Sequence, residues 1–420
     1  MAALSYSNFD LILSKEPSGR YQVRVEAPDG GQPKEEFRPP FTQAELEELQ
    51  QTVEGTTREV IPSGGQGSEV SDRRSRVKLF GERLYDAIFV NNIRSSLALS
   101  LQAAQLKGAG VRIRLRLDKV PELADLPWEY LYDPDTRIHL ALQPLTPIVR
   151  HLDLPGPASS LLVEPPINVL VMISNPSDRI SLDGAREWEN IREALHDLTQ
   201  AKLVSVSQVK ATIPALQACL QKQGCHIFHY VGHGGFDETG DAVLLFEDEQ
   251  GKASPVTGTE LNVALGHSSL RLVVLNSCDT ARAPAEDPFA GLAQGLVRMM
   301  IPAVVAMQWK IIDTGAITFA KAFYGAIANN LPVDGALVEA RKGMFLAKYP
   351  TEWGTPVLFM RGADGRIFQI DQPSAKQLRD RQIKALSDDA RSAIDEKDYD
   401  AALHLLQEIK VVLASNHPLQ

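Results

Sequence analysis

Two short segments of the 420-residue sequence place a reactive side chain at the end of an apolar run. The first run begins at His226 and ends in Gly232-His233-Gly234-Gly235, and the second ends in Asn276-Ser277-Cys278. An imidazole within about 3 Å of a thiol can take its proton or hold it as a thiolate, which is the attacking form of cysteine. These residue types therefore predict nucleophilic catalysis, with Cys278 as nucleophile and His233 as base.

The glycines around His233 suggest a second chemical element, an oxyanion hole. A backbone without Cβ atoms can approach a substrate carbonyl closely. Backbone N–H groups at Gly234 and Cys278 could then point at one developing oxyanion, and each such donor commonly contributes about 2.7 to 4 kcal/mol. We therefore expect Gly234 and Cys278 to supply the oxyanion hole.

Most cysteines and histidines beside an apolar strand are core residues rather than catalytic ones. The combination favours catalysis for His233 and Cys278, because the histidine is enclosed by glycines and the cysteine follows 45 residues later at another strand end. We interpret the other cysteines, and the histidines within the first run, as core or supporting residues: Cys219, Cys225, His226 and His229.

Other chemistries fit the sequence less well. A zinc site needs Cys and His at close ligand spacings, yet Cys278 has no cysteine near it in sequence and no HExxH motif occurs. A P-loop lysine motif and a GxSxG elbow are also missing. The formal net charge of −10 argues against a nucleic-acid binder. We therefore expect no metal, no cofactor and no direct nucleic-acid partner.

The sequence also indicates a cytoplasmic protein without a membrane segment. Its longest apolar run, 299–309, contains Pro302 and is far shorter than the roughly 20 residues that span a bilayer. The first residues lack the basic and apolar regions of a signal peptide. Only three cysteines occur, which suits a reducing compartment where a thiol nucleophile survives.

From residue 169 onward, short apolar runs alternate with helical patterns, which is typical of a mostly parallel sheet covered on both faces. Functional groups of such a sheet lie at the carboxyl ends of its strands. Helices are expected to start at Asp287-Pro288, Asp313 and Asp334. The predicted strands are Val169–Ser174, Leu203–Ser207, His226–Val231, Leu270–Leu275, Ala303–Gln308 and Pro356–Met360.

The earlier part of the chain has a different pattern. Alternating apolar residues predict a hairpin that turns at Glu16–Gly19, followed by a helix at Gln43–Gln51. Residues 54–72 are rich in Gly, Ser and Thr and predict a flexible linker. A helix over 78–106 and a half-buried strand at Val111–Leu117 follow, and we expect Trp128 to fill the core beyond them.

From Val77 to Phe368 the residues resemble the CHAT domain of the caspase, gingipain and separase group. This resemblance implies a histidine–cysteine dyad, no metal cofactor and hydrolysis of peptide bonds in protein substrates. Because many relatives are bacterial and are switched on by a sensor or partner, it also implies a bacterial origin, an activating protein partner and a role in antiviral defence or regulated cell death. The matching segments are Leu126-Pro-Trp-Glu-Tyr-Leu-Tyr132, Tyr230-Val-Gly-His-Gly234, Asn276-Ser-Cys278, Phe319–Tyr324, Ala340-Arg341 and Trp353–Phe359.

The expected fold class is α/β, with a caspase-like, mostly parallel sheet flanked by helices. A smaller α+β accessory or pseudo-caspase half precedes it, and a helical tail follows. We divide the chain into an accessory region with its linker at 1–72, a noncatalytic caspase-like half at 73–155, a catalytic CHAT domain at 156–371, and a tail at 372–420 that is a candidate interaction module.

Two hypotheses remain open at this point. The first is a cysteine endopeptidase, and the second is a catalytically silent CHAT scaffold that binds a protein partner. Caspases carry a Gln-Ala-Cys-x-Gly segment where this chain has Asn276-Ser-Cys-Asp-Thr280, so cleavage after aspartate is not implied. Asp279 is a candidate for favouring a basic P1 residue, although a carboxylate there can also stabilise a turn.

Overall fold

The computed structural model divides into two compact units, Met1–Ile370 and Asp371–Gln420. In the second unit, residues 390–395 are helical. The apolar side chains of Ile394, Tyr399, Leu403 and Leu406 are exposed there. The residues that the structure describes are 4–54, 67–124, 126–154, 160–222, 224–266, 269–277, 288–309, 311, 313–347, 351–370, 386–387, 390–395, 398–399, 402–403, 405–407 and 409.

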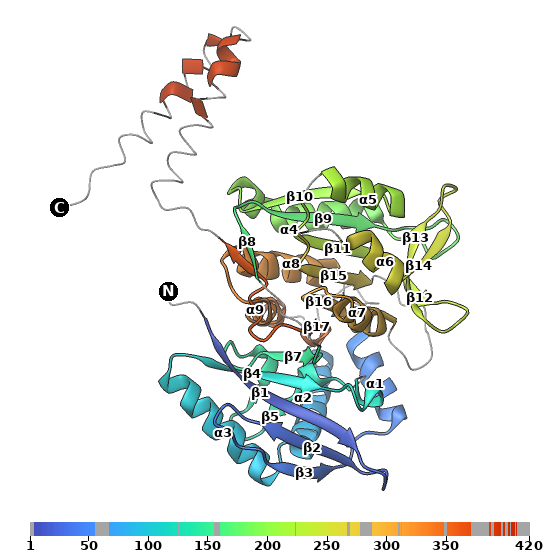
Figure 1. The fold of residues 1–420 in the computed structure, drawn as a ribbon, viewed down its shortest axis with the longest axis vertical. Helices are drawn as coiled ribbons and strands as arrows, with labels where there is room; N and C mark the ends of the chain where they lie inside the picture. Colours follow the sequence, from blue (N-terminus) through green and yellow to red (C-terminus); the bar gives the residue numbers. More distant parts are fainter. Residues whose placement is uncertain are drawn as a thin grey trace, which may run out of the picture. The chain divides into compact units, whose positions relative to one another are not determined.

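An 11-stranded sheet runs through the whole first unit (Figure 1), in the order β10-β9-β11-β15-β16-β17-β7-β4-β1-β2-β3. Its strands are β1 (Tyr6–Lys15), β2 (Tyr21–Glu26), β3 (Lys34–Phe37), β4 (Gly110–Arg116), β7 (Ile148–His151), β9 (Ile167–Ile173), β10 (Val204–Val209), β11 (Ile227–Gly232), β15 (Leu272–Ser277), β16 (Ala303–Met307) and β17 (Pro356–Met360).

The sheet changes direction near its middle, between β16 and β17, and again at its edge, where β2 is antiparallel to both β1 and β3. Strands β10, β9, β11, β15 and β16 are parallel to one another, whereas β17 is antiparallel to β16. Strands β7, β4 and β1 continue parallel to β17. The carboxyl ends of β9, β11, β15 and β16 therefore meet at one edge, and those of β17, β7, β4 and β1 meet at the opposite edge.

Two helical layers cover the parallel strands β10, β9, β11, β15 and β16, because residues on both faces of these strands are apolar. On β9, Val169 and Val171 belong to the core under α4, α8 and α9, while Leu170 and Met172 belong to the core under α5, α6 and α7. The α-helices are α1 (Gln43–Glu54), α2 (Gly67–Ile88), α3 (Asn91–Leu106), α4 (Gly184–Gln200), α5 (Ile213–Lys222), α6 (Gly258–Leu265), α7 (Pro288–Arg298), α8 (Asp313–Ala328) and α9 (Val333–Leu346).

Among the described residues there are three smaller sheets, and one of them follows β11 directly. That sheet has the order β12-β13-β14, and the other two pair β18 with β8 and β5 with β6. Their strands are β5 (Tyr132–Asp133), β6 (Ile138–His139), β8 (Leu161–Val163), β12 (Gly234–Phe236), β13 (Ala242–Glu247), β14 (Ala253–Thr257) and β18 (Phe368–Ile370); the 3-10 helices are η2 (Pro121–Leu123), η3 (Trp128–Tyr130), η4 (Leu140–Leu142) and η5 (Glu352–Gly354).

The expected fold class and the main strands are confirmed. The hairpin of β1 and β2 forms as predicted, and Trp128 is fully buried. The linker prediction was wrong at both ends, because residue 54 belongs to α1 and residues 67–72 belong to α2, and its middle, 55–66, lies outside the described residues. The single helix expected over 78–106 is two helices, and the break precedes Asn91, whose φ of 44° does not fit a helix. The four-part division of the chain stays a prediction.

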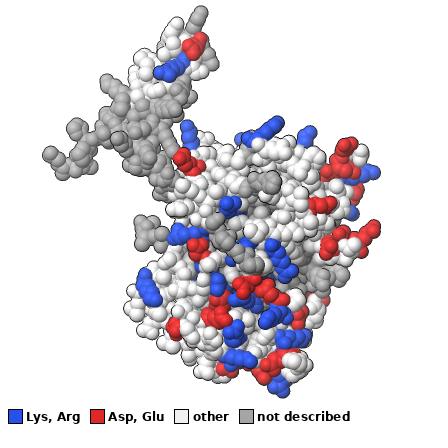
Figure 2. All heavy atoms as spheres, viewed as in Figure 1, with Lys and Arg blue, Asp and Glu red and all other residues white. Residues whose placement is uncertain are grey.

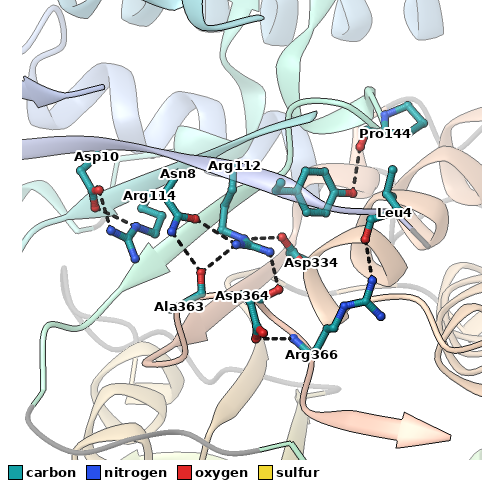
Figure 3. A network of polar contacts seen from close by, with 11 residues as sticks. Leu4, Asn8, Asp10, Arg112, Arg114, Pro144, Asp334, Ala363, Asp364 and Arg366 are labelled. Carbon is teal, nitrogen blue, oxygen red and sulfur yellow. Dashed lines mark hydrogen bonds and ion pairs between the residues drawn. The ribbon is translucent and has the colours of Figure 1, made fainter. Parts of the chain in front are cut away.

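The basic face of β4 is buried more deeply than its alternating pattern predicted. Arg112 is 1% exposed, and its Nε donates to Asp334 Oδ2 at 2.6 Å. The same guanidinium donates to Asn8 and to the carbonyl oxygens of Ala363 and Asp364 (Figure 3). The expectation that Asp334 begins a helix as its cap was therefore wrong, because this carboxylate is committed to the buried ion pair.

Residues of the segments Leu126–Tyr132 and Trp353–Phe359 lie beside β7. Arg150 on β7 is buried, and its Nη2 donates to Glu129 at 2.9 Å and to Gln308 at 3.2 Å. Tyr130 donates to the carbonyl oxygen of Thr351 and packs edge-on against Trp353. These contacts thus connect the segment 129–130 to β7 and to residues 351–353, which precede β17.

We predict that Asp334→Ala destabilises the chain by about 3 to 5 kcal/mol, because it leaves the Arg112 charge buried without its partner. Asp334→Asn, which keeps an acceptor oxygen, should lose less. The measurement is the urea unfolding midpoint.

The matched control is Asp197→Ala, which removes an ion pair to Lys321 whose side chains are mostly exposed. Equal midpoints for Asp334→Ala and Asp197→Ala would contradict the importance of the buried pair.

Candidate functional site

The two strands that carry the predicted site are direct neighbours in the sheet. Strands β11 and β15 are parallel, and their register pairs Gly232 with Ser277. Adjacent strands lie about 4.8 Å apart. His233 follows the first of these residues. Cys278 follows the second in sequence, and both Cys278 and Asp279 lie outside the described residues. The chain therefore leaves both strands at the same edge of the sheet.

The His233 side chain is buried and is held in one orientation by a backbone group. Its exposed fraction is 5%, and its Nε2 lies 2.9 Å from the carbonyl oxygen of Ile180. A carbonyl oxygen can only accept a hydrogen bond, so Nε2 carries the proton. In the neutral ring Nδ1 is then the nitrogen that can accept a proton, which defines the basic atom of the site.

The backbone of His233 is fixed by Tyr230, three residues earlier on β11. The Tyr230 hydroxyl proton is shared between the carbonyl oxygens of His233 and Leu245, each 2.9 Å away. Leu245 N also donates to His233 O at 3.0 Å. The absence of a Cβ at Gly232 leaves room for the Tyr230 side chain, since a Cβ there would lie 2.5 Å from the Tyr230 hydroxyl oxygen. The glycine is thus required by packing beneath the histidine.

Gly234, the other described member of the predicted site, is the first residue of β12 and pairs with Leu244 on β13. The sheet of β12, β13 and β14 was not predicted from the sequence. Its two turns share an Asp-x-x-Gly order, and the glycines, Gly240 and Gly251, have φ values of 87° and 73°. That turn signal could have revealed the sheet.

Acidic side chains gather on the side of the molecule formed by this small sheet (Figure 2). Turn formation accounts for two of them. Asp237 accepts hydrogen bonds from Thr239 and Asp241, and Asp248 accepts from the backbone of two residues in its own turn. These two carboxylates therefore stabilise the turns of the small sheet.

Of the other histidines and cysteines near β11, His229 and Cys225 are buried, whereas His226 is only partly buried. His229 lies within 3.0 Å of the Tyr324 hydroxyl, and burial lowers the pKa of His229 to about 4, so its ring is neutral near pH 7. His226 Nδ1 accepts a hydrogen bond from Asn168 N. Burial raises the pKa of the Cys225 thiol to about 12. Cys219 is partly buried.

In the described part of the chain, no group of three or more His, Cys, Asp or Glu side chains could hold a metal ion. No helix among these residues combines the length and apolar character needed to cross a membrane. Cytoplasmic localisation stays a prediction.

The described residues thus form an α/β fold with a mostly parallel sheet and a histidine fixed at the carboxyl end of a strand. The family model of the CHAT domain matches residues 78–398. The chain belongs to the CHAT domain family, and the resemblance seen in the sequence is confirmed. Bacterial origin stays a prediction. No curated protein matches the sequence.

Several solved structures have similar folds at low sequence identity. A chain of the Saccharomyces cerevisiae separase–securin complex is 13% identical, with a TM-score of 0.49, and the match covers 87% of this chain and 30% of that one. The complex of the Porphyromonas gingivalis RgpB pro- and mature domains is 10% identical, with a TM-score of 0.36. That match covers 76% of this chain and 77% of that one. The Drosophila initiator caspase Dronc is 12% identical, with a TM-score of 0.26. That match covers 47% of this chain and 84% of that one. This chain thus spans less than a third of the matched separase chain.

We predict that Gly232→Ala destabilises the first unit by about 1 to 3 kcal/mol, because the added methyl group would collide with Tyr230 and approach Ser174. The melting temperature measures this effect. The matched control is Gly235→Ala, three residues along, where an added Cβ meets no atom within 4 Å. Equal losses in the two variants would show that the packing of Tyr230 beneath Gly232 does not matter.

Proposed function

We propose that this chain is a cysteine endopeptidase in which Cys278 attacks a peptide carbonyl and His233 is the base. One observation carries the proposal: the register of β11 and β15, which pairs Gly232 with Ser277. This register ends β11 and β15 at one sheet edge, which supports a pairing of the residues that follow them in sequence, His233 and Cys278. Membership of the CHAT domain family supports the same chemistry.

In the proposed first step, His233 Nδ1 takes the thiol proton and the Cys278 sulfur forms a bond to the peptide carbonyl carbon. The Ile180 carbonyl oxygen accepts from Nε2–H, so it stabilises the imidazolium that results. The negative charge moves to the substrate oxygen. Backbone N–H groups of Gly234 and Cys278 are the proposed donors to that oxyanion.

In the second step, the peptide C–N bond breaks and the leaving amine takes the proton from His233. A thioester joins the amino-terminal part of the substrate to Cys278. Water, losing a proton to His233, then attacks this thioester and releases a carboxylic acid and the thiol. The cycle consumes one water molecule and needs no cofactor.

Several finer expectations accompany this proposal. They are a protein activator, a bacterial defence or cell-death setting, and a basic preference at P1 through Asp279. The neighbour in the yeast complex is bound to securin, which is a protein partner of that separase. A protein activator for this chain remains part of the proposal.

The decisive test is to map new peptide N-termini in a host lysate after adding the parent chain or Cys278→Ala. We expect both Cys278→Ala and His233→Asn to lose at least about 10³-fold in cleavage rate, because the nucleophile and base act as a unit. Cys219→Ala is the matched control and should cleave like the parent. Cleavage by Cys278→Ala at the parent rate would overturn the proposal.

The alternative function is a catalytically silent scaffold that binds a protein partner. It would be favoured if an electrophilic peptide probe failed to label Cys278 while a bound partner could still be captured. Labelling of Cys278, but not of Cys219, supports the peptidase.

A further inference from the structure

We infer that Asn175 and Glu247 are positioning residues, which hold the Ile180 carbonyl against the His233 imidazole and thereby set which ring nitrogen is the base. The kinetic consequence of this inference rests on the proposed peptidase function. The structural consequence, a fixed His233 tautomer, does not.

Asn175 closes the loop that carries Ile180. This loop, residues 174–183, connects β9 to α4. The Asn175 side chain donates from Nδ2 to Leu182 O and accepts from Leu182 N through Oδ1, both at 2.8 Å. This pair of hydrogen bonds holds the two ends of the loop, Asn175 and Leu182, together. Ile180 lies between the two ends.

Glu247 connects that closed loop to the sheet that follows His233. It is the last residue of β13, and its Oε1 accepts from Asn175 N at 2.7 Å. A hydrogen bond to a carboxylate is stronger than one between neutral groups. The side chain of Glu247 therefore ties the loop to the same β13 strand whose Leu245 holds the His233 backbone.

The far side of the loop is attached to the turn between β13 and β14. Ser177 N donates to Gly251 O at 2.8 Å, and Asp178 Oδ1 accepts from Ala253 N at 2.8 Å. This backbone hydrogen bond lowers the pKa of the Asp178 carboxyl. The loop therefore has two attachments to one hairpin, with Ile180 next to them in sequence.

Hydrogen bonds, rather than packing, must define the conformation of this loop. Residues 177–181 are exposed, and the Ile180 side chain is 60% exposed. A segment with few buried apolar contacts opens easily unless polar contacts hold it. If Asn175 or Glu247 is lost, the Ile180 carbonyl no longer has a fixed position, and His233 can exchange the proton between its two ring nitrogens.

The test measures the tautomer of His233 directly in the full chain labelled with ¹⁵N-histidine. In the parent, long-range ¹H–¹⁵N spectra should show the proton on Nε2. In Asn175→Ala and Glu247→Leu the ring nitrogens should show averaged shifts. The His233 signals are assigned by their loss in His233→Asn. Glu247→Gln keeps an acceptor oxygen and should restore the parent spectrum.

The matched control is Glu249→Leu, which makes the same replacement two residues away at an exposed side chain of the same hairpin. It should leave the tautomer unchanged. If Asn175→Ala folds poorly, Asn175→Asp serves in its place, because it replaces the Nδ2 donor by a carboxylate oxygen that cannot donate to Leu182 O. An unchanged Nε2–H tautomer in folded Glu247→Leu and in the folded Asn175 variant would overturn the inference.

Kinetics provide a second readout once a substrate is known. Glu247→Leu should lower kcat/KM by about 10- to 100-fold, since small misplacements of catalytic groups have effects of this size. It should also change the pH profile, whereas Glu249→Leu should change neither. If the tautomer changes in Glu247→Leu but no form of the chain has peptidase activity, the proposed function is contradicted and the positioning role of Glu247 is still supported.

Discussion

The parallel pairing of β11 with β15 is the constraint on which the site depends. Because Gly232 is paired with Ser277, β11 and β15 end at the same edge of the sheet. A shift of this register by one residue would turn the side chains of β15 to the other face of the sheet. Two apolar helical layers oppose such a shift, because they bury both faces of these strands.

The sheet reverses direction between β16 and β17, and β17, β7, β4 and β1 belong to the half beyond this reversal. The carboxyl ends of β7, β4 and β1 lie at the opposite edge from His233. Buried ion pairs hold this half in place instead: Arg112 contacts Asp334, and Arg150 contacts Glu129. Burying such charges is costly, so each pair needs further hydrogen bonds, and both arginines have them. The signature residue Glu129 therefore has a packing role in this half.

Much of this architecture could be predicted from the sequence. Strands covered on both faces read as continuous apolar runs, and the strand ends before His233 and Cys278 were visible as changes in composition. The contacts that position His233 were not visible. The Ile180 partner is a backbone carbonyl, which any residue type provides, and Asp334 reaches Arg112 from 222 residues away. Asp334 resembled a helix cap because its long-range partner leaves no local pattern.

The most direct test of the account is the rate at which iodoacetamide alkylates Cys278 between pH 5 and pH 9, quantified by mass spectrometry beside Cys219 in the same chain. A thiol held as thiolate by His233 reacts well below pH 8.5, where free cysteine is mostly protonated. The account predicts that Cys278 reacts faster than Cys219 at pH 6.5, and that His233→Asn removes this advantage. Equal rates for the two cysteines, or an advantage that survives in His233→Asn, would contradict a catalytic pair at the ends of β11 and β15.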